Sequence, residues 1–443
     1  MMDEKTLGGP IFLTRRRSRW FLAVLMVFAA LVRLMVAYIT VHYFDLSFYV
    51  DWSTGVTNDF YGAYNNIGNL DYPPLFLFPL FLTGKVLGVG AVRAFDPYMM
   101  LALKGWQVLF DLAGILLLYR VLRREGELAG LAGAAIWAVN PAGILNSSYW
   151  GQTDSIMIFL VVLAFLLLEE DRPVWSGVVM AFACLMKFQS LYFAPVYALA
   201  LLTTYPLKRI LQAASAGAGT VLAVFLPFMA RSGWALPLEI YFGGFGQYQG
   251  SSLNAFNFYA ASGLNYKHFS SKIFGLIQVD HLSTILLVAA VALLVAVWFT
   301  ATEKSVWLMG FLFMQTVFMF TTRMHERYQI PVLVMALVAA ARHRSRGLFG
   351  SFGALAVMVF LNHFLVLQEI FAGDKPAGWI AHYDAIIEAL SCVNLVLYFV
   401  TAYIALRICY RRGRYSFVRS FRAMLPERWR KAPPGPNPQQ GAP

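Results

Sequence analysis

Apolar runs long enough to cross a membrane recur along the whole chain, separated by short polar or basic segments. An α-helix needs about 20 apolar residues to cross the hydrocarbon core of a bilayer. The two-residue alternation typical of a transmembrane β-barrel is absent from the sequence. The pattern therefore predicts an all-α integral membrane protein, a bundle of about twelve transmembrane helices.

Clusters of Arg and Lys orient the predicted spans, because they favour the cytoplasmic side of a membrane. The cluster 15–19 places the start of the first span, residues 20–43, in the cytoplasm. The apolar run 73–92 is ambiguous, because as a crossing helix it would carry the later cluster Arg120 to Arg124 to the outside. We therefore predict that this run stays at the outer surface, which leaves Arg93 outside as well.

The same alternation of basic clusters places the remaining spans and puts both termini in the cytoplasm. The spans are 97–119, 128–146, 154–168, 174–186, 190–204, one from Lys208-Arg209 to about 230, 281–300, 305–321, one that ends at Arg342, and two on either side of an outer segment, 372–382. Residues 1–430 are predicted to form one membrane domain. The Pro/Gly/Gln-rich residues 431–443 are predicted to form a cytoplasmic tail without fixed structure.

Composition agrees with this class of protein, since 59% of the residues are hydrophobic and 13% are charged. The net charge of +12 comes from short clusters at the ends of spans, so we expect no nucleic-acid partner. Cys184, Cys392 and Cys409 show neither metal-ligand spacing nor a disulfide framework. The sequence shows no clear set of metal ligands and leaves metal dependence open, and we expect no cofactor.

Charged residues inside the spans are few. Arg33 falls in the first span, where it marks either a functional site or a buried structural pair, and the sequence leaves both open. Lys104, Gln107 and Asp111 in the second span are the only other polar cluster near the midplane, and the sequence has no internal repeat. A transporter needs such groups, so a polyprenyl-linked glycan flippase or a solute transporter is the alternative class.

The first long outer segment, Phe44–Leu75, combines four carboxylates with seven aromatic residues between 48 and 72. Aromatic rings favour the membrane–water interface, and the segment ends in a rigid Asp71-Tyr72-Pro73-Pro74 element. Such a loop is tied to the surface and can hold a carboxylate in place. Solvated carboxylates on a plain connector are the simpler interpretation of Asp51 and Asp59.

The other unusual polar motifs fall on the same outer side as this loop. They are residues 150–154 (WGQTD), 187–189 (KFQ), 254–257 (NAFN) and 325–327 (HER). Each has a structural interpretation. For Asp154, the favoured interpretation is that it caps the next helix. Lys187 could extend its charge to the membrane interface. The 325–327 motif could be an interfacial ion cluster. Asn254 and Asn257 are expected to order their loop.

Together, these residues suit a reaction with a lipid-phosphate donor. Cationic groups stabilise the charge of a leaving phosphate, a placed carboxylate deprotonates an acceptor hydroxyl, and aromatic rings pack against sugar faces. The sequence lacks a Gly-rich nucleotide-binding motif that would indicate a soluble sugar nucleotide.

With these motifs, the sequence resembles the GT-C class of polytopic glycosyltransferases. Its spacing from Asp45 to Trp52, then Phe60-Tyr61 and 71–75 (DYPPL), is similar to the first lumenal loop of the dolichyl-phosphate-glucose-dependent glucosyltransferases of N-glycosylation. Residues 186–195 (MKFQSLYFAP) resemble that family's Phe-Lys-Gln stretch. The 150–154 and 325–327 motifs also resemble prokaryotic mannosyltransferase-like relatives, with Arg327 where the glucosyltransferases carry Lys.

The resemblance implies an inverting transfer from a polyprenyl-phosphate sugar, with Asp45 as the general base. Leu46 and Ser47 depart from the glucosyltransferase pattern of an aromatic and an acid, so we expect a different acceptor. The other carboxylates suit the role less well, since Asp71 precedes two prolines and would fix the turn, and Asp51 would face away from Asp45 on a helix.

We therefore expect a plasma-membrane glycosyltransferase whose active site faces outward. It would move a hexose, mannose or glucose, from a polyprenyl phosphate to a lipid-linked or cell-envelope acceptor, beside membrane lipids. Related enzymes with a protein or aminoarabinose substrate are the runners-up. The residues expected to bind substrate are Asp71, Gln152, Asp154, Lys187, Gln189, His325, Glu326 and Arg327.

Overall fold

The computed structural model describes residues 15–87, 96–370 and 380–411, and these residues are mainly helical. The helices of 22 residues or more are α1 (Arg15–Ile39), α5 (Pro97–Leu122), α11 (Leu207–Ser232), α14 (Val279–Thr300), α17 (Arg346–Ile370) and α18 (Tyr383–Cys409). The shorter helices are α2 (Tyr43–Asn58), α3 (Ala63–Asn66), α4 (Leu77–Leu87), α6 (Glu127–Ala138), α7 (Pro141–Ile144), α8 (Asp154–Glu169), α9 (Pro173–Met186), α10 (Ala194–Thr204), α12 (Leu236–Gln247), α13 (Phe258–Ala261), α15 (Val306–Phe320) and α16 (Ile330–Arg342).

Short irregular elements join these helices. They are the 3₁₀ turns η1 (Pro74–Phe76), η2 (Arg123–Glu125), η4 (Phe188–Phe193) and η5 (Glu326–Gln329), the π-helical turn η3 (Leu145–Trp150), and the antiparallel strands β1 (Lys272–Ile273) and β2 (Ile277–Gln278). The two strands pair Lys272 with Gln278 and Ile273 with Ile277.

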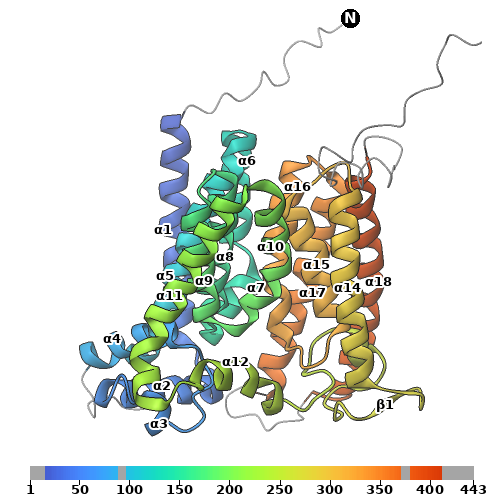
Figure 1. Ribbon diagram of the computed structural model, residues 1–443. Helices are drawn as coiled ribbons and strands as arrows, with labels where there is room; N and C mark the ends of the chain where they lie inside the picture. The colour runs from blue at the N-terminus through green and yellow to red at the C-terminus, as the bar shows by residue number, and fades with distance from the viewer. Residues whose placement is uncertain (1–14, 88–95, 371–379, 412–443) are drawn as a thin grey trace, which may run out of the picture.

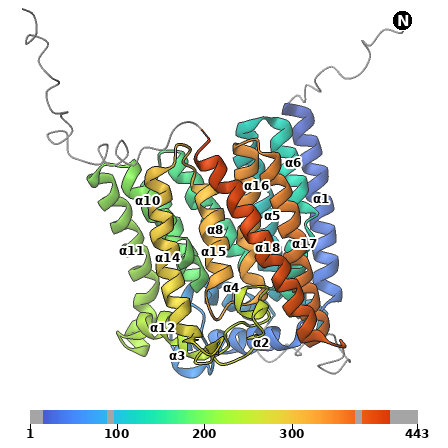
Figure 2. The ribbon, with the colours of Figure 1, turned by 90° about the vertical axis from the view of Figure 1, so that its right-hand side faces the viewer.

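The long helices stand side by side as one bundle (Figures 1 and 2). At its lower end in Figure 1, α2, α3, α4, α12 and the β1–β2 ribbon lie across or beside the bundle, and α1 begins at the opposite end. Six helices in the described residues are long and apolar enough to cross a membrane, or seven if α6 and the bent stretch after it form one span. The predicted number of twelve spans remains a prediction.

Two helices without a polar face form the centre of the bundle. Every residue of α16 from Ile330 to Ala340 is buried, and α15 is buried from Trp307 to Met319. A helix that is apolar all round gains nothing from contact with water and is stable only inside a protein or a membrane. These helices lead directly into and out of the 325–327 motif, which they therefore hold on a rigid support.

The first outer segment differs from the predicted loop, because most of it is helical. The helix of the first span ends at Ile39 rather than Tyr43, and α2 starts a new helix. At this break, the Lys104 ammonium donates a hydrogen bond to the Thr40 carbonyl oxygen, at 2.6 Å. Asp45 thus lies in the first turn of α2 and not at the end of the first span.

The side chains that hold α2 in place follow a helical spacing. Leu46, Tyr49, Trp52 and Val56 are buried, whereas Asp51 is exposed. This spacing puts the four apolar residues on one face. The exposed position of Asp51 agrees with the expectation that it faces away from Asp45.

The apolar run that follows the Pro-Pro pair forms the short helix α4, which packs against α2. The Ser53 hydroxyl donates to the Leu80 carbonyl at 2.8 Å, and a Cβ at Gly84 would lie 2.1 Å from the Thr57 hydroxyl oxygen. At about 1.5 Å per residue, a helix from Leu77 to Leu87 is too short to cross a bilayer. The geometry therefore supports a run that stays at the α2 end; Arg93 lies outside the described residues.

A labelling experiment tests this topology. In a variant with the three native cysteines replaced, a single cysteine at position 93 should react with a membrane-impermeant thiol reagent in intact cells. A cysteine that replaces Arg124 is the matched control and should react only after lysis. Protection of position 93 in intact cells would mean that residues 73–92 cross the membrane.

Arg33 has a structural partner inside the bundle. Its Nε donates to Asp111 Oδ2 at 2.7 Å, and both side chains are buried. The Trp137 indole and the Ser147 hydroxyl also donate to the Asp111 carboxylate, at 3.0 and 2.9 Å. Of the two interpretations left open by the sequence, the geometry favours the buried structural pair, which joins α1, α5 and the stretch after α6.

Breaking this pair should destabilise the protein. Arg33→Met leaves the Asp111 carboxylate buried without its cation, at an expected cost of about 3–5 kcal/mol. The double variant Arg33→Met/Asp111→Leu removes both charges and should recover much of this loss. Thermal unfolding of the purified protein in detergent measures both. An unchanged midpoint with abolished sugar transfer would instead assign Arg33 to function.

Candidate active site

The residues selected from the sequence come together at the lower end of the bundle in Figure 1, where α2 crosses it. They reach this region from α2, from the turn after η3, from the junction of α9 and η4, and from η5. Six of the nine line one of two adjoining cavities: Asp45, Asp71, Gln152, Lys187, Gln189 and Arg327. The three exceptions are Asp154 and Glu326, which are buried, and His325, which is half-buried; none of them lines either cavity.

Asp45 is held by two donors from one short segment. The indole Nε1 of Trp150 donates to Asp45 Oδ2 at 2.8 Å, and the Gln152 side-chain amide donates to the same oxygen. His42 caps α2, since its Nδ1 accepts from the Asp45 backbone N–H at 3.2 Å. These contacts fix the carboxylate, and among the described residues both side-chain donors reach Oδ2, which leaves Oδ1 to accept a proton.

His42 contributes to this site without carrying a charge. Its ring stacks on Trp150 with centroids 4.7 Å apart. Burial lowers the pKa of His42 to about 4, so the ring is neutral at physiological pH. A neutral ring can accept the helix-capping hydrogen bond, which a protonated Nδ1 could not do.

The local backbone after α6 explains how Trp150 and Gln152 reach Asp45. The π-helical turn η3 ends at Trp150 and is followed by Gly151, which has a φ of +81°. This left-handed conformation favours glycine, and a Cβ here would also lie 2.8 Å from Cγ of Lys104. The Gln152 N–H then donates to the Asn146 carbonyl at 3.0 Å, which closes the turn.

Lys187 and Asp154 form a buried ion pair. The Lys187 ammonium lies 2.7 Å from Asp154 Oδ1, and the Asn146 amide donates to Asp154 Oδ2 at 3.0 Å. The interpretation of Asp154 as a helix cap, which the sequence favoured, is therefore wrong. Both of its carboxylate oxygens bond to other side chains, and the N-cap residue of α8 is Thr153. Lys187 is only 3% exposed, so its charge does not extend to the interface.

Arg327 is fixed in a similar way from η5. Its Nη1 donates to Glu326 Oε1 at 2.8 Å, and its guanidinium lies over Trp150, 5.4 Å from the ring centroid. Burial opposes the charge, but the Glu326 carboxylate holds the pKa of Arg327 well above its ordinary value. Arg327 therefore stays a cation.

His325 is not a third cation beside Lys187 and Arg327. Burial, with the nearby charges of Arg327 and Lys187, lowers the pKa of His325 well below its ordinary value. Its ring packs edge-on against Tyr248 and Tyr328. His325 is thus a neutral residue behind the cavity wall.

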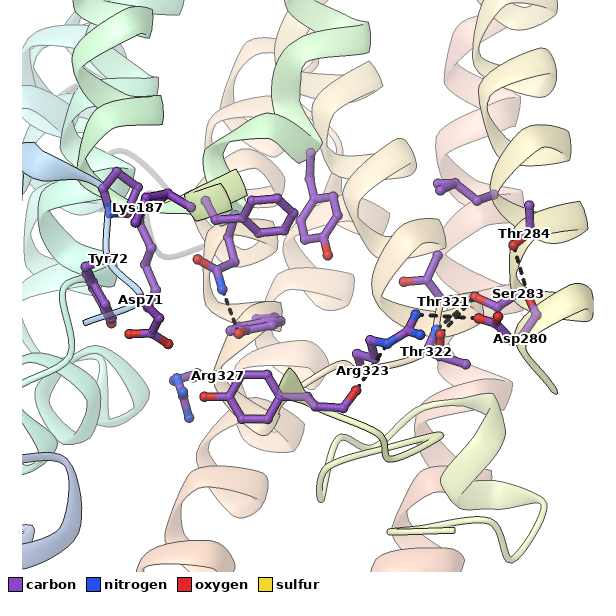
Figure 3. Close-up of a pocket in the computed structure, with 18 residues that line it drawn as sticks. Asp71, Tyr72, Lys187, Asp280, Ser283, Thr284, Thr321, Thr322, Arg323 and Arg327 are labelled. Atoms are coloured by element: carbon purple, nitrogen blue, oxygen red, sulfur yellow. Dashed lines mark hydrogen bonds and ion pairs between the residues drawn. The ribbon is translucent and has the colours of Figure 1, made fainter. Parts of the chain in front are cut away.

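The larger cavity has a volume of about 340 Å³ and two chemically different ends. Figure 3 shows Asp71, Lys187 and Arg327 on one side and Arg323 with Asp280 and several hydroxyl groups on the other. Between them, the Gln189 amide donates to the Tyr328 hydroxyl at 2.6 Å. The remaining lining includes Phe188, Tyr192, Ile240, Tyr248 and Leu287.

The smaller cavity, of about 130 Å³, contains Asp45. Aromatic side chains of α2 line it together with Gln152 and Asn69. Asp71, Tyr72, Tyr248 and Arg327 line both cavities, so the two spaces adjoin. Asp45 lines the smaller cavity, Lys187 lines the larger one, and Arg327 lines both. This arrangement is suited to proton removal next to an anion-binding site.

Sequence reasoning missed several lining residues. Tyr328 directly follows the 325–327 motif and could have been included on that ground. Tyr248, Asp280 and Ser283 carried no signal, because they lie in or just after the long segment between the predicted spans that end near 230 and begin at 281, and the path of this segment is set by tertiary contacts. Among the described residues, no group of three His, Cys, Asp or Glu side chains is arranged to hold a metal ion.

Asp59 is a partly exposed charge, with 39% of its side chain accessible, and it also has partners at the surface. Its Oδ2 lies 3.1 Å from Arg231 Nη2 and accepts from the Asn66 amide at 3.0 Å. Asp59 therefore ties the end of α2 to the end of α11, at the surface and away from both cavities.

Comparison with known proteins identifies the family. No curated protein matches the chain. The model of glycosyltransferase family 87 matches residues 69–324, more than half of the 443 residues. This range includes the segments that carry Asp71, Gln152 and Lys187, and it ends just before Arg327. The chain belongs to glycosyltransferase family 87.

Proposed function

We propose that this glycosyltransferase moves a hexose, mannose or glucose, from a polyprenyl-phosphate sugar to a lipid-linked or cell-envelope acceptor. The reaction would take place at the outer face of a plasma membrane, with inversion at the anomeric carbon. The observation that carries the proposal is the meeting of two cavities at Arg327, with Asp45 in one and Lys187 in the other.

The larger cavity supports a phosphate-bearing donor. Lys187, which is buried, and Arg327, which is partly buried, face the same end of it, and charge-assisted hydrogen bonds are the strong contacts available to a phosphate. Ile240 and Leu287 supply apolar lining nearby, which suits the first part of a lipid chain. Gln189 and Tyr328 would complete the polar wall beside the phosphate.

The smaller cavity supports Asp45 as the general base. In the proposed step, the acceptor hydroxyl gives its proton to Oδ1 of Asp45, and its oxygen forms a bond to the anomeric carbon of the sugar. The bond between that carbon and the phosphate oxygen breaks, and the phosphate leaves with the electron pair. Lys187 and Arg327 stabilise the charge that develops on it.

The transporter alternative has less support. The Arg33 and Asp111 charges near the middle of the bundle are buried and bonded to each other. They do not line either cavity, and family membership indicates a glycosyltransferase.

A donor panel tests the proposed function. Membranes that contain the protein, and matched membranes without it, are incubated with radiolabelled polyprenyl-phosphate mannose, polyprenyl-phosphate glucose and the corresponding nucleotide sugars. We expect protein-dependent transfer into a lipid or envelope fraction from one polyprenyl-phosphate sugar. Transfer from a nucleotide sugar in membranes free of polyprenyl phosphate would reject the donor class, and label in a protein fraction would move the proposal to a protein acceptor.

A further inference from the structure

The last two helices of the described chain, α17 and α18, each carry a buried asparagine whose side-chain amide contacts a segment beside the site. Asn362 on α17 and Asn394 on α18 are fully buried within apolar helices. In Figure 2 these helices run together down to the lower end of the bundle, where the segment between α12 and α14 lies. Burying an amide without hydrogen-bond partners costs folding free energy. The contacts of these two side chains therefore indicate their role.

Both asparagines bind the backbone of one outer segment. Asn362 donates to the Asn254 carbonyl at 2.6 Å and accepts from the Phe256 N–H at 3.1 Å. Asn394 donates to the Phe256 carbonyl at 2.7 Å. The side chains thus act as a substitute for a neighbouring strand and satisfy three backbone groups that are shielded from water.

The same outer segment is bonded to the strip of chain that carries Arg327. The Leu253 N–H donates to the Met324 carbonyl at 3.0 Å, and residues 253 and 254 both form bridges with His325. Asn394 also lies within 3.4 Å of the Gln329 side-chain oxygen, two residues after Arg327. Arg327 is therefore held from both sides by groups that depend on the asparagines.

We propose that Asn362 and Asn394 are positioning residues that hold Arg327 at the donor phosphate through residues 253–256 and Gln329. This inference rests on the proposed role of Arg327. It assigns a part in the site to α17 and α18. These helices lie beyond residues 69–324, which the family model matches, and none of the sequence motifs lies in them.

A double-mutant cycle tests the proposal. Asn394→Ala and Asn362→Ala should each raise the donor KM about tenfold, because residues in one hydrogen-bond network couple by amounts of this order. In an Arg327→Gln background, the same substitutions should change the donor KM less than about threefold, since Arg327 is no longer there to be positioned. Donor KM and kcat are measured in membranes containing equal amounts of folded protein.

Ser391→Ala is the matched control. Ser391 is buried one turn before Asn394 on α18, but its hydroxyl bonds within its own helix, to the Ile387 carbonyl. We expect this variant to keep the wild-type donor KM. If Asn362→Ala does not accumulate in the membrane, Asn394→Ala, which loses one loop contact and the contact with Gln329, provides the cycle.

The outcomes separate this inference from the proposed function. Equal effects of the asparagine variants in the presence and absence of Arg327, or an unchanged donor KM, would overturn the positioning role while leaving the donor proposal intact. An Arg327→Gln variant with an unchanged donor KM would overturn both.

Discussion

Asp45→Asn should lower sugar transfer by about 10²–10⁴-fold, the contribution of a general base. The substitution keeps the size of the side chain, so that Trp150 and Gln152 retain a partner oxygen, but it removes the atom that takes the proton. The protein should still fold and bind donor. The measurement is the initial rate of transfer at saturating donor, together with donor binding by the purified variant.

Asp51→Asn is the matched control for this prediction. Asp51 lies on the same helix, carries the same charge and is exposed. It does not line either cavity, so its loss should leave most of the activity. Near-normal transfer by Asp45→Asn combined with an inactive Asp51→Asn variant would assign the base to Asp51 and reject the proposed geometry.

Arg327→Gln and Lys187→Gln should each increase the donor concentration needed for half-maximal rate by one to two orders of magnitude. A charge-assisted contact to phosphate contributes about 1.5–3 kcal/mol, and each 1.4 kcal/mol corresponds to a factor of ten. Because each cation has a buried carboxylate partner, the single variants should also be less stable. Donor titrations of equal amounts of folded protein separate the two effects.

Two further variants control for this loss of stability. Lys187→Gln/Asp154→Asn removes the whole ion pair, and it should recover stability but not the donor affinity. Arg231→Gln removes an exposed cation on the same side of the protein and should leave the donor dependence unchanged. If the wild-type donor dependence persists in both Arg327→Gln and Lys187→Gln, the donor phosphate is bound elsewhere.

The sequence pattern predicted most helices well, because long apolar runs with Pro or Asp at their starts leave little choice. The helix α5 begins at Pro97 as predicted, with the Asp96 carboxylate accepting from the Tyr98 N–H, and α14 begins two residues before the predicted span. The helix α2 was missed because its polar and aromatic residues resemble a surface loop. Only the buried spacing of Leu46, Tyr49, Trp52 and Val56 would have indicated it.

The site was harder to predict than the helices. The motifs identified which segments matter, but the partners of Asp154 and Arg33 lie 33 and 78 residues away in the sequence. Periodicity and charge patterns along the chain carry no information about such pairing. The neutral state of His325 likewise depends on burial by Tyr248 and Tyr328, which no local motif could show.

The Lys187–Asp154 pair also constrains how this family could diverge. A relative that lost the lysine alone would keep an uncompensated carboxylate in the protein interior, at a cost of about 3–5 kcal/mol, which is a large part of the stability of most proteins. Replacement of the two positions would therefore have to occur together, or with the carboxylate first made neutral. Homologues should show these two sites as a covarying pair even where the sugar that they transfer has changed.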